Sequence, residues 1–528
     1  MGKLNTTGIH NYQMLIVSAL LGGVAALWLG FELDWDLLNY HLYNPHALLT
    51  GRSGVDFAVA QQQGFLNPTL YIPVYLAFKY LPAWVLVFIV GAIQGGQILL
   101  IYLIAEKVVV KQVPRLSLLV VAILGCLGPV FLGQLGATPA DTILSALVLA
   151  GLLLVLGGLE PERKARIGRI GLFAGVLLGV AVALKLTMAI YAVALGIVLL
   201  FGYRREGQLH LVLSYATGAA VGFLLAGGVW FLHLWLTYGN PLFPYFNSIF
   251  ESPWIETASY RDVRFMPKSM LERLIYPYLW FNDPHRVWEM PFRDIRVLLL
   301  YPVMFLLPLL RWKFLGQKAP ALRILLVFLG LSYILWISVF SIYRYLAVVE
   351  MLAAVALFAS VVAISDGKKW VVLVLMVLVA SQFLVDFSRQ PTSWQLDPET
   401  QTALSGLAPD SMLIIDSYEP LAYLALWVPE NVPIIRIRAN FMNPDNDSTP
   451  LAREAARRVD KHQGRYYLLN TSAQADQPFM TRDLERVGLS LTTPENCKPV
   501  FMDEELQKKL TPVICELQEL NTPARGFD

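Results

Sequence analysis

The sequence predicts a mainly α-helical membrane protein that crosses the bilayer about eleven times and ends in a small α/β domain. Of the 528 residues, 56% are hydrophobic and only 15% are charged, which is too apolar for a water-soluble globule. Apolar runs of spanning length recur until about residue 389, and the composition becomes polar after that point. A net charge of +2, with basic residues scattered through short loops, excludes a nucleic-acid-binding protein.

The first apolar run, at residues 12–31, is long enough to span the bilayer and shows no signal-peptide cleavage pattern, so we expect an uncleaved anchor. An external loop at 31–81 follows, in which Asn67-Pro68, Pro73 and Lys79 interrupt the apolar residues and predict a broken interfacial or re-entrant segment. Further spans are expected at 82–105, 116–133, 141–158, 168–184, 187–203, 209–237, 297–310, 323–342, 345–364 and 370–386. The run at 297–310 is short for a span.

Basic residues give the orientation, because Lys and Arg are retained in short cytoplasmic loops. Alternate loops carry Lys107, Lys111 and Arg115; Arg163, Lys164, Arg166 and Arg169; Arg204 and Arg205; Arg311, Lys313, Lys318 and Arg323; and Lys368 and Lys369. These five loops and the N-terminus are predicted to be cytoplasmic. The 31–81 loop, a second long loop at 238–296 and the C-terminal domain are then external.

Residues 390–528 read as the α/β domain. Short apolar runs at 412–416, 433–438, 465–470 and 498–502 alternate with helical patterns near 419–427, 450–461 and 480–487. Cys497 and Cys515 both lie in this domain, whereas Cys126 lies within a span. Because the domain is assigned to the oxidising side of the membrane, we expect a disulfide between Cys497 and Cys515.

Candidate catalytic residues follow the first span, where acids and aromatics alternate at the membrane edge. Asp34 and Asp36 stand out as carboxylates, with Asn39, Tyr40 and His41 close behind them as auxiliary residues. The competing interpretation is that Asp36 caps an interfacial helix that carries an aromatic belt. For His41, an interfacial hydrogen-bonding role is the ordinary alternative.

Three further ionisable residues fall on the predicted outer side at membrane depth, where a charge is costly and usually has a function or a partner. They are Asp141 at the start of a span, Lys185 in a tight turn, and Arg344 in another outer turn. Asp141 is equally well explained as a helix cap, and Lys185 and Arg344 as snorkelling anchors. Glu350 is interpreted as a buried partner rather than a catalyst.

These residues fit the transfer of a sugar from a lipid carrier. The outer surface has no supply of nucleotide sugars, so an enzyme there commonly uses a donor that is already activated on a membrane lipid. Transfer from a polyprenyl phosphate needs a carboxylate to take the acceptor proton and cations to hold the leaving phosphate. Asp36 or Asp34 would supply the carboxylate, and Lys185 and Arg344 would supply the cations.

The chain resembles the GT-C superfamily of polytopic glycosyltransferases that use lipid-phosphate-linked sugars. The resemblance covers about the first 390 residues and rests on the acidic segment after the first span. It extends to Asp36 through Pro45, Leu66-Asn67-Pro68, Lys185 and Tyr238-Gly-Asn-Pro241, which look like one bacterial branch.

This resemblance implies inversion at the anomeric carbon, with Asp36 activating a hydroxyl of a glycan, lipid or protein acceptor. It also implies a site on the periplasmic face of the bacterial inner membrane, with Asp34 orienting the acceptor or binding a divalent ion such as Mg²⁺ or Mn²⁺. Two carboxylates at this spacing suit a metal only in a loop, because on a regular helix they diverge.

Two other classes of function remain open. A transporter or flippase for a lipid-linked glycan would place ionisable residues near the bilayer midplane and show repeated halves. A non-catalytic subunit of a polysaccharide-export assembly would use the C-terminal domain for docking. The clustering of acids and cations on one predicted face favours the enzyme.

Overall fold

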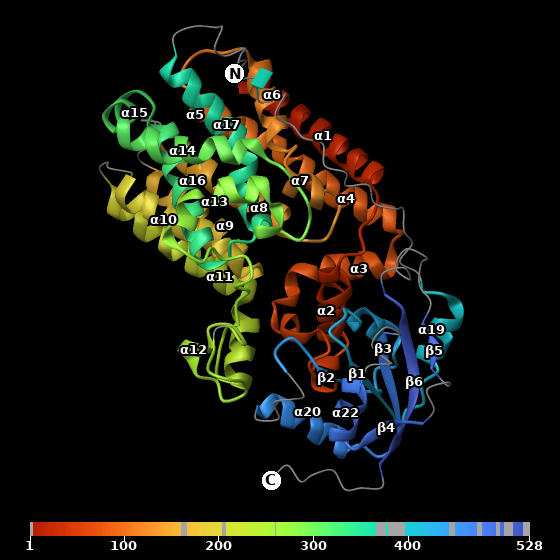
Figure 1. Ribbon diagram of the computed structural model, residues 1–528. Helices are drawn as coiled ribbons and strands as arrows, with labels where there is room; N and C mark the ends of the chain where they lie inside the picture. The colour runs from red at the N-terminus through yellow and green to blue at the C-terminus, as the bar shows by residue number, and fades with distance from the viewer. Residues whose placement is uncertain are drawn as a thin grey trace. The chain divides into compact units, whose positions relative to one another are not determined.

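The computed structural model describes residues 4–159, 166–202, 207–258, 260–365, 376–377, 396–442, 449–471, 478–492, 497–500 and 510–520. The chain forms two compact units (Figure 1). The first, the membrane unit, comprises Met1–Gly30, Val87–Gly228 and Arg261–Arg389. The second, the α/β unit, comprises Phe31–Leu86, Val229–Tyr260 and Gln390–Asp528. The expected span at 370–386 and the loop with Lys368 and Lys369 lie almost wholly outside the described residues.

The membrane unit is helical, as predicted. Its helices are α1 (Leu4–Leu29), α4 (Ala83–Gly95), α5 (Gln97–Val108), α6 (Arg115–Gly125), α7 (Pro129–Gln134), α8 (Asp141–Gly157), α9 (Ile167–Leu184), α10 (Ala189–Ile197), α11 (Gln208–Tyr238), α13 (Met270–Asn282), α14 (Ile295–Leu310), α15 (Trp312–Lys318), α16 (Pro320–Val339) and α17 (Ala347–Ile364). Both α4 and α11 continue into the ranges of the α/β unit.

Six of the described stretches are long and apolar enough to cross a membrane, and the bent pair α14–α15 would make a seventh. The pair is bent by 89°, and the short apolar run at 297–310 forms its first helix, α14. Shorter apolar helices occupy Arg115–Gly125, Asp141–Gly157 and Leu186–Gly202, where three more spans were expected. A multi-pass membrane fold is therefore confirmed, with six helices of full spanning length among the described residues.

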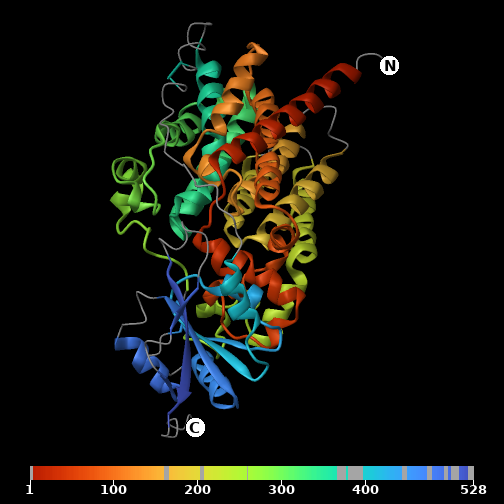
Figure 2. The ribbon, with the colours of Figure 1, turned by 90° about the vertical axis from the view of Figure 1, so that its right-hand side faces the viewer.

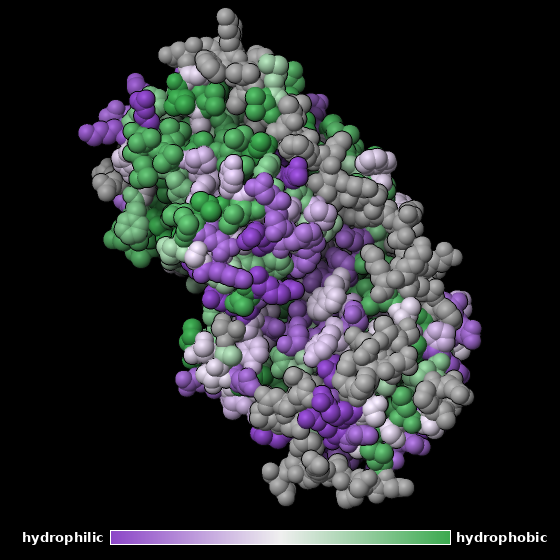
Figure 3. Space-filling view, viewed as in Figure 1, coloured by the Kyte–Doolittle hydropathy of each residue, from purple (hydrophilic) through white to green (hydrophobic). Residues whose placement is uncertain are grey.

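Small residues let the membrane helices approach closely. A Cβ added to Gly175 on α9 would lie 2.1 Å from the carbonyl oxygen of Tyr215 on α11, so neither backbone could stay in place. Such contacts are typical of helix pairs in lipid, where packing replaces the hydrophobic effect as the driving force. Apolar side chains cover the outside of the unit, including Phe173, Leu225, Leu309 and Leu310. The surface over these helices is largely green in Figure 3.

The C-terminal part of the α/β unit is a mixed sheet flanked by helices, as the sequence predicts. Its strands are β1 (Ser411–Asp416), β2 (Ile434–Arg438), β3 (Arg465–Thr471), β4 (Leu489–Leu491), β5 (Lys498–Pro499) and β6 (Pro512–Glu519). The order is β2-β1-β3-β6-β4, with β5 also pairing to β6. Strands β2, β1 and β3 are parallel, and the pairs made by β6 are antiparallel. The helices are α19 (Pro398–Ser405), the 3₁₀ helix at Ala422–Trp427, α20 (Pro450–Asp460) and α22 (Pro478–Arg486).

The loop after the first span packs on this sheet. It contains a π-helical turn at Leu37–His41, helix α2 (Tyr43–Leu49) and helix α3 (Ile72–Tyr80). Phe57 pairs with Ile435 of β2 as a parallel bridge, in which Phe57 N donates to Ile434 O over 2.9 Å and Arg436 N to Phe57 O over 3.0 Å. Figures 1 and 2 both show the red-orange loop helices beside the blue sheet.

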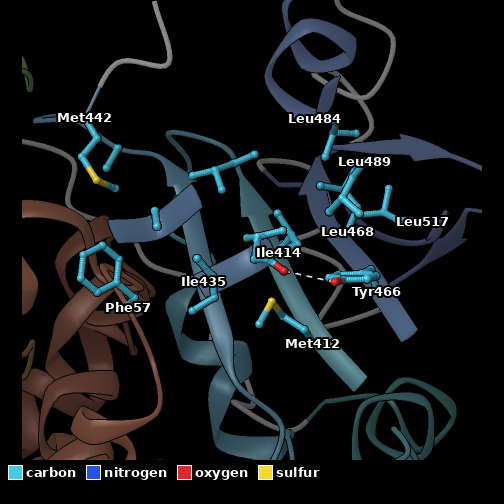
Figure 4. Packing of buried hydrophobic residues seen from close by; sticks show 14 of the residues in the cluster. Phe57, Met412, Ile414, Ile435, Met442, Tyr466, Leu468, Leu484, Leu489 and Leu517 are labelled. Carbon is cyan, nitrogen blue, oxygen red and sulfur yellow. Dashed lines mark hydrogen bonds between the residues drawn. The ribbon is translucent and has the colours of Figure 1, made fainter. Parts of the chain in front are cut away.

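One hydrophobic core joins these segments. The Phe57 side chain packs beside Ile435 and Met442 at the edge of the cluster that includes Ile414 and Leu468 (Figure 4). The same cluster contains Phe243 and Ile255 from the segment after α11. The α/β unit is thus built from three distant stretches of the chain. The last of these stretches begins at Gln390, where the sequence predicts the α/β domain to begin, but the unit also includes the loop at 31–86 and the segment at 229–260.

A buried ion pair ties the loop to the C-terminal residues. Arg52 donates to both carboxylate oxygens of Asp56, over 2.8 Å and 2.9 Å, and neither side chain is more than 1% exposed. Its remaining donors reach backbone oxygens of Val428, Pro429 and Val432. Burial raises the pKa of Asp56, although the charge of Arg52 opposes that shift. We call this pair, with its carbonyl partners, the Arg52 clamp.

The structure also joins Cys497 and Cys515 in a disulfide, with their Cα atoms 4.2 Å apart. This is the pairing that the sequence predicts. It links the residue before β5 to the middle of β6, where Cys515 is buried in the core of the sheet.

Removing the cation of the Arg52 clamp leaves a buried carboxylate and three backbone oxygens without their donor. We expect Arg52→Met to lower the free energy of unfolding of the α/β unit by about 3–5 kcal/mol, the usual cost of breaking a buried pair. Denaturant titration of the detergent-solubilised protein measures this. Arg457→Met is the control, because Arg457 is 52% exposed and pairs with Glu454 at the surface, where a loss of about 1 kcal/mol at most is expected. Equal losses in the two variants would contradict the role of the clamp.

His46 makes stability depend on pH. It lies on α2 with Nδ1 3.0 Å from the Tyr75 hydroxyl, and burial, aided by the charges of Arg52 and Lys79, lowers its pKa from 6.5 to about 4. Between pH 6.5 and 4 the unfolded chain therefore binds a proton that the folded chain does not, so stability falls as the pH falls. We expect the unfolding midpoint of the wild type to drop more steeply over this range than that of His46→Gln. Parallel pH profiles would show that His46 does not contribute.

Candidate functional site

The acidic segment of the α/β unit opens a helix, but the residue that caps it is Asp34. Its Oδ1 accepts a hydrogen bond from Leu37 N over 2.6 Å, three residues along the chain. Asp36 already has helical backbone angles, with φ −65° and ψ −43°, and makes no capping hydrogen bond to the turn that follows. The alternative that Asp36 serves as the helix cap is therefore wrong. Asp36 is half-buried.

The auxiliary residues lie on the π-helical turn that follows. Asn39 and His41 are completely buried, and Tyr40 is 5% exposed. His41 stacks on Tyr71, with ring centroids 3.8 Å apart, and Tyr40 makes T-shaped contacts with both rings. Asn39 Nδ2 donates to Ala60 O over 3.0 Å. π-Helical turns are rare and often occur at functional sites, because the wider turn realigns side chains.

In the membrane unit, Asp141 pairs with Lys185. The Nζ of Lys185 is 2.8 Å from Asp141 Oδ1, and Gln134 Nε2 donates to Oδ2 over 3.0 Å. Asp141 is the first residue of α8 and its side chain is completely buried. It makes no capping hydrogen bond at the start of α8, so the interpretation of Asp141 as a helix cap is wrong as well. Its charge instead holds the amine at the end of α9.

Lys185 and Arg344 come together around one aromatic ring. The Lys185 Nζ lies 5.6 Å from the centroid of Tyr345, and the Arg344 guanidinium carbon lies 5.3 Å from the same centroid. The sequence singled out the two cations but not Tyr345, the ring that both of them approach. The only signal for it was an aromatic residue next to a membrane-depth arginine.

Backbone contacts fix the turn that carries Arg344. The Tyr191 hydroxyl donates to Tyr345 O over 2.6 Å, and Trp336 Nε1 donates to Ile342 O over 2.7 Å. The Tyr343 hydroxyl donates to Asp294 Oδ2 over 3.3 Å, where Asp294 is itself paired with Arg296. Arg344 is therefore presented by a rigid turn, which a simple snorkelling anchor does not require.

Glu350 is a buried partner, as expected. Its two carboxylate oxygens accept from Val130 N and Phe131 N, over 3.0 Å and 3.1 Å, at the start of α7. These are backbone donors that no helical carbonyl can reach, and a carboxylate at a helix N-terminus also interacts favourably with the helix dipole. Glu350 therefore stabilises the fold of α7.

A metal site is not evident from the side chains. Among the described residues, no three His, Cys, Asp or Glu side chains gather closely enough to hold an ion. Asp34 caps the helix that contains Asp36, so the two carboxylates lack the loop geometry that a shared cation would need. A divalent ion such as Mg²⁺ or Mn²⁺ stays a prediction, and no step below depends on one.

The predicted site residues thus form two groups. The α/β unit holds Asp34, Asp36, Asn39, Tyr40 and His41, and the membrane unit holds Asp141, Lys185 and Arg344. Tyr40 contacts His41 in the first group, and in the second Lys185 pairs with Asp141 and shares the ring of Tyr345 with Arg344.

Comparison with known proteins gives matches by structure alone. No known family profile matches the chain, and no curated protein sequence does. The solved structure of ArnT from Cupriavidus metallidurans bound to undecaprenyl phosphate matches with a TM-score of 0.52 and 14% sequence identity. The match covers 97% of this chain and 98% of that one. ArnT in the apo state matches over the same shares, with a TM-score of 0.42 and 13% identity. The chain therefore shares the fold of this ArnT structure, a mainly helical multi-pass fold with a small C-terminal sheet such as the sequence predicts.

Proposed function

We propose that this membrane protein transfers a sugar from a polyprenyl-phosphate donor to an acceptor hydroxyl, with inversion at the anomeric carbon. One observation carries the proposal. Two cations that the sequence singled out, Lys185 and Arg344, gather around Tyr345 in a chain whose fold matches ArnT over its full length. The undecaprenyl phosphate bound to ArnT supports a lipid phosphate as the ligand of these cations. We place the reaction on the periplasmic face of a bacterial inner membrane, because the alternation of basic loops predicts that side.

Lys185 and Arg344 would hold the phosphate of the donor. The leaving phosphate gains negative charge as the anomeric carbon–oxygen bond breaks, and fixed cations stabilise that charge more than they stabilise the intact donor. Arg344 can bind two phosphate oxygens at once, whereas Lys185 acts as a point charge. Asp141 keeps the Lys185 amine in place when no donor is bound.

Asp36 would act as the general base. In the transfer, the acceptor oxygen forms a new bond to the anomeric carbon from the face opposite the phosphate, and the acceptor proton passes to the Asp36 carboxylate. The electron pair of the breaking bond goes to the lipid phosphate, so charge and atoms balance. Asp34 would support this step indirectly, because it caps the helix in which Asp36 lies.

Replacing the cations should weaken the binding of the donor. We expect Lys185→Met and Arg344→Gln each to lose about 1.5–3 kcal/mol of donor affinity, the value of a charge-assisted hydrogen bond. The measurement is thermal stabilisation of the detergent-purified protein by a panel of polyprenyl-phosphate sugars, since a ligand of the folded state raises the unfolding midpoint.

The panel needs a control for the carboxylate that Lys185→Met leaves buried. The double variant Lys185→Met with Asp141→Asn removes that charge, so its donor affinity reports the loss of the amine alone. Wild-type affinity in the double variant and in Arg344→Gln would reject the phosphate-binding role. Tight binding of donors by the wild type without any release of polyprenyl phosphate would favour the flippase.

Replacing Asp36 should slow the chemistry and leave donor binding intact. A positioned general base contributes about 10²- to 10⁴-fold, so Asp36→Asn should lower kcat by that factor. The fold should tolerate the change, because Asn keeps the size of the side chain and Asp34 keeps the cap. The kcat and the donor affinity of both proteins test this, and a wild-type kcat for Asp36→Asn would reject Asp36 as the base.

A further inference from the structure

A strained stretch of the loop after the first span lies between residues 35–49, which we call the Asp36 segment, and the C-terminal sheet. Ala58 and Gln61 both have a φ of +54°, a left-handed conformation that residues other than glycine rarely adopt. Such strain persists only where the surrounding structure fixes the backbone, and it is concentrated at functional sites. The contacts of Gln61 show what fixes this stretch.

Gln61 bridges two strand ends of the C-terminal sheet. Its side chain is buried, with 1% of the residue exposed. The amide Nε2 donates to Tyr418 O over 2.9 Å, just after β1, and Oε1 accepts from Asn440 N over 3.0 Å, just after β2. Both halves of the amide are therefore used on backbone groups, a match that requires a side chain of this length and chemistry.

The residues on either side of Gln61 hold the Asp36 segment. Asn39, three residues after Asp36, donates to the carbonyl of Ala60 over 3.0 Å. Asn44 donates to the carbonyl of Gln63 over 2.9 Å. Gln61 lies between these two carbonyls, so anything that fixes Gln61 also fixes the acceptors that orient the π-helical turn.

We propose that Gln61 is a positioning residue through which the C-terminal domain holds the Asp36 segment in its productive place. The inference rests on the proposed function of Asp36. It gives a role in the reaction to the C-terminal domain, to which we assign no catalytic residue. The domain supplies two backbone groups that bind the Gln61 side chain and so fix the loop around it. Asn39 is hydrogen-bonded to that loop and in turn fixes the helix that carries Asp36. A misplacement of about 1 Å at a reacting group can cost about a hundredfold in rate.

Glycine substitutions separate positioning from stability. Gln61→Gly removes both hydrogen bonds and also relieves the left-handed strain, so the global unfolding midpoint should stay close to that of the wild type. Ala58→Gly is the matched control, because it relieves the same φ of +54° and removes no hydrogen-bonding side chain. Gln61→Asn is a second test, since Asn tolerates this conformation but is one methylene too short to reach both partners.

The readouts are amide hydrogen exchange over residues 35–49, kcat and donor affinity. We expect exchange in Gln61→Gly and Gln61→Asn to be about tenfold faster than in the wild type. We expect kcat to fall about ten- to a hundredfold with unchanged donor affinity, and Ala58→Gly to behave as the wild type.

Each other outcome rejects the proposal. Unchanged exchange over 35–49 would show that Gln61 does not fix the segment. Faster exchange with wild-type kcat would show that the fixed position does not matter for turnover, and a loss of donor affinity would point to a role in binding. The exchange result needs no substrate, so it stands apart from the proposed function, which fails if the wild type turns over no donor in the panel.

Discussion

The buried pair of Arg52 and Asp56 is the interaction on which the α/β unit depends. Every donor of the Arg52 guanidinium is used, two on Asp56 and the others on carbonyls of the C-terminal residues. Asp56 in turn accepts from Ile434 N and from the Tyr43 hydroxyl. A charge at 0% exposure is tolerable only when it is paired and hydrogen-bonded in this way. The pair therefore specifies one arrangement of the loop against the sheet.

The same rule governs the charges of the membrane unit. Asp141 has Lys185, Arg296 has Asp294, and Glu350 has the first amides of α7. Arg344 lies against the ring of Tyr345, which the Lys185 amine also approaches, so that two cations share one aromatic ring. The pairs Asp141–Lys185 and Asp294–Arg296 stabilise the fold. We propose that the two cations at the Tyr345 ring in addition bind the phosphate of the donor.

Local patterns in the sequence were enough to predict the fold class and most of the helices and strands. Hydropathy predicted the membrane helices, and alternating short runs predicted the sheet of the C-terminal domain, although β4 and β6 were missed. What could not be predicted was the pairing of Phe57 with Ile435, because no local pattern records contacts between residues so far apart in the chain. The same limit hid the bridge made by Gln61. The left-handed backbone at Gln61 left no sequence signal, since glycine is the usual residue there.

The candidate site residues were likewise only partly predictable from the sequence. Charge and position selected Asp36, Lys185 and Arg344, whereas the roles of their neighbours depended on geometry. Asp34 could be told from Asp36 as the cap only once the start of the helix was known, because both precede the apolar run. Tyr345 could be recognised only from the two cations that it faces.

The configuration of the transferred sugar tests the central claim most directly. The detergent-purified protein would be given a polyprenyl-phosphate sugar of known anomeric configuration, and the anomeric proton of the product would be read by NMR. A base that activates the acceptor for direct displacement of the phosphate predicts a product of inverted configuration, formed together with free polyprenyl phosphate. A product with the configuration of the donor would exclude direct displacement from the face opposite the phosphate, and would contradict the assignment of Asp36 as the base of that displacement.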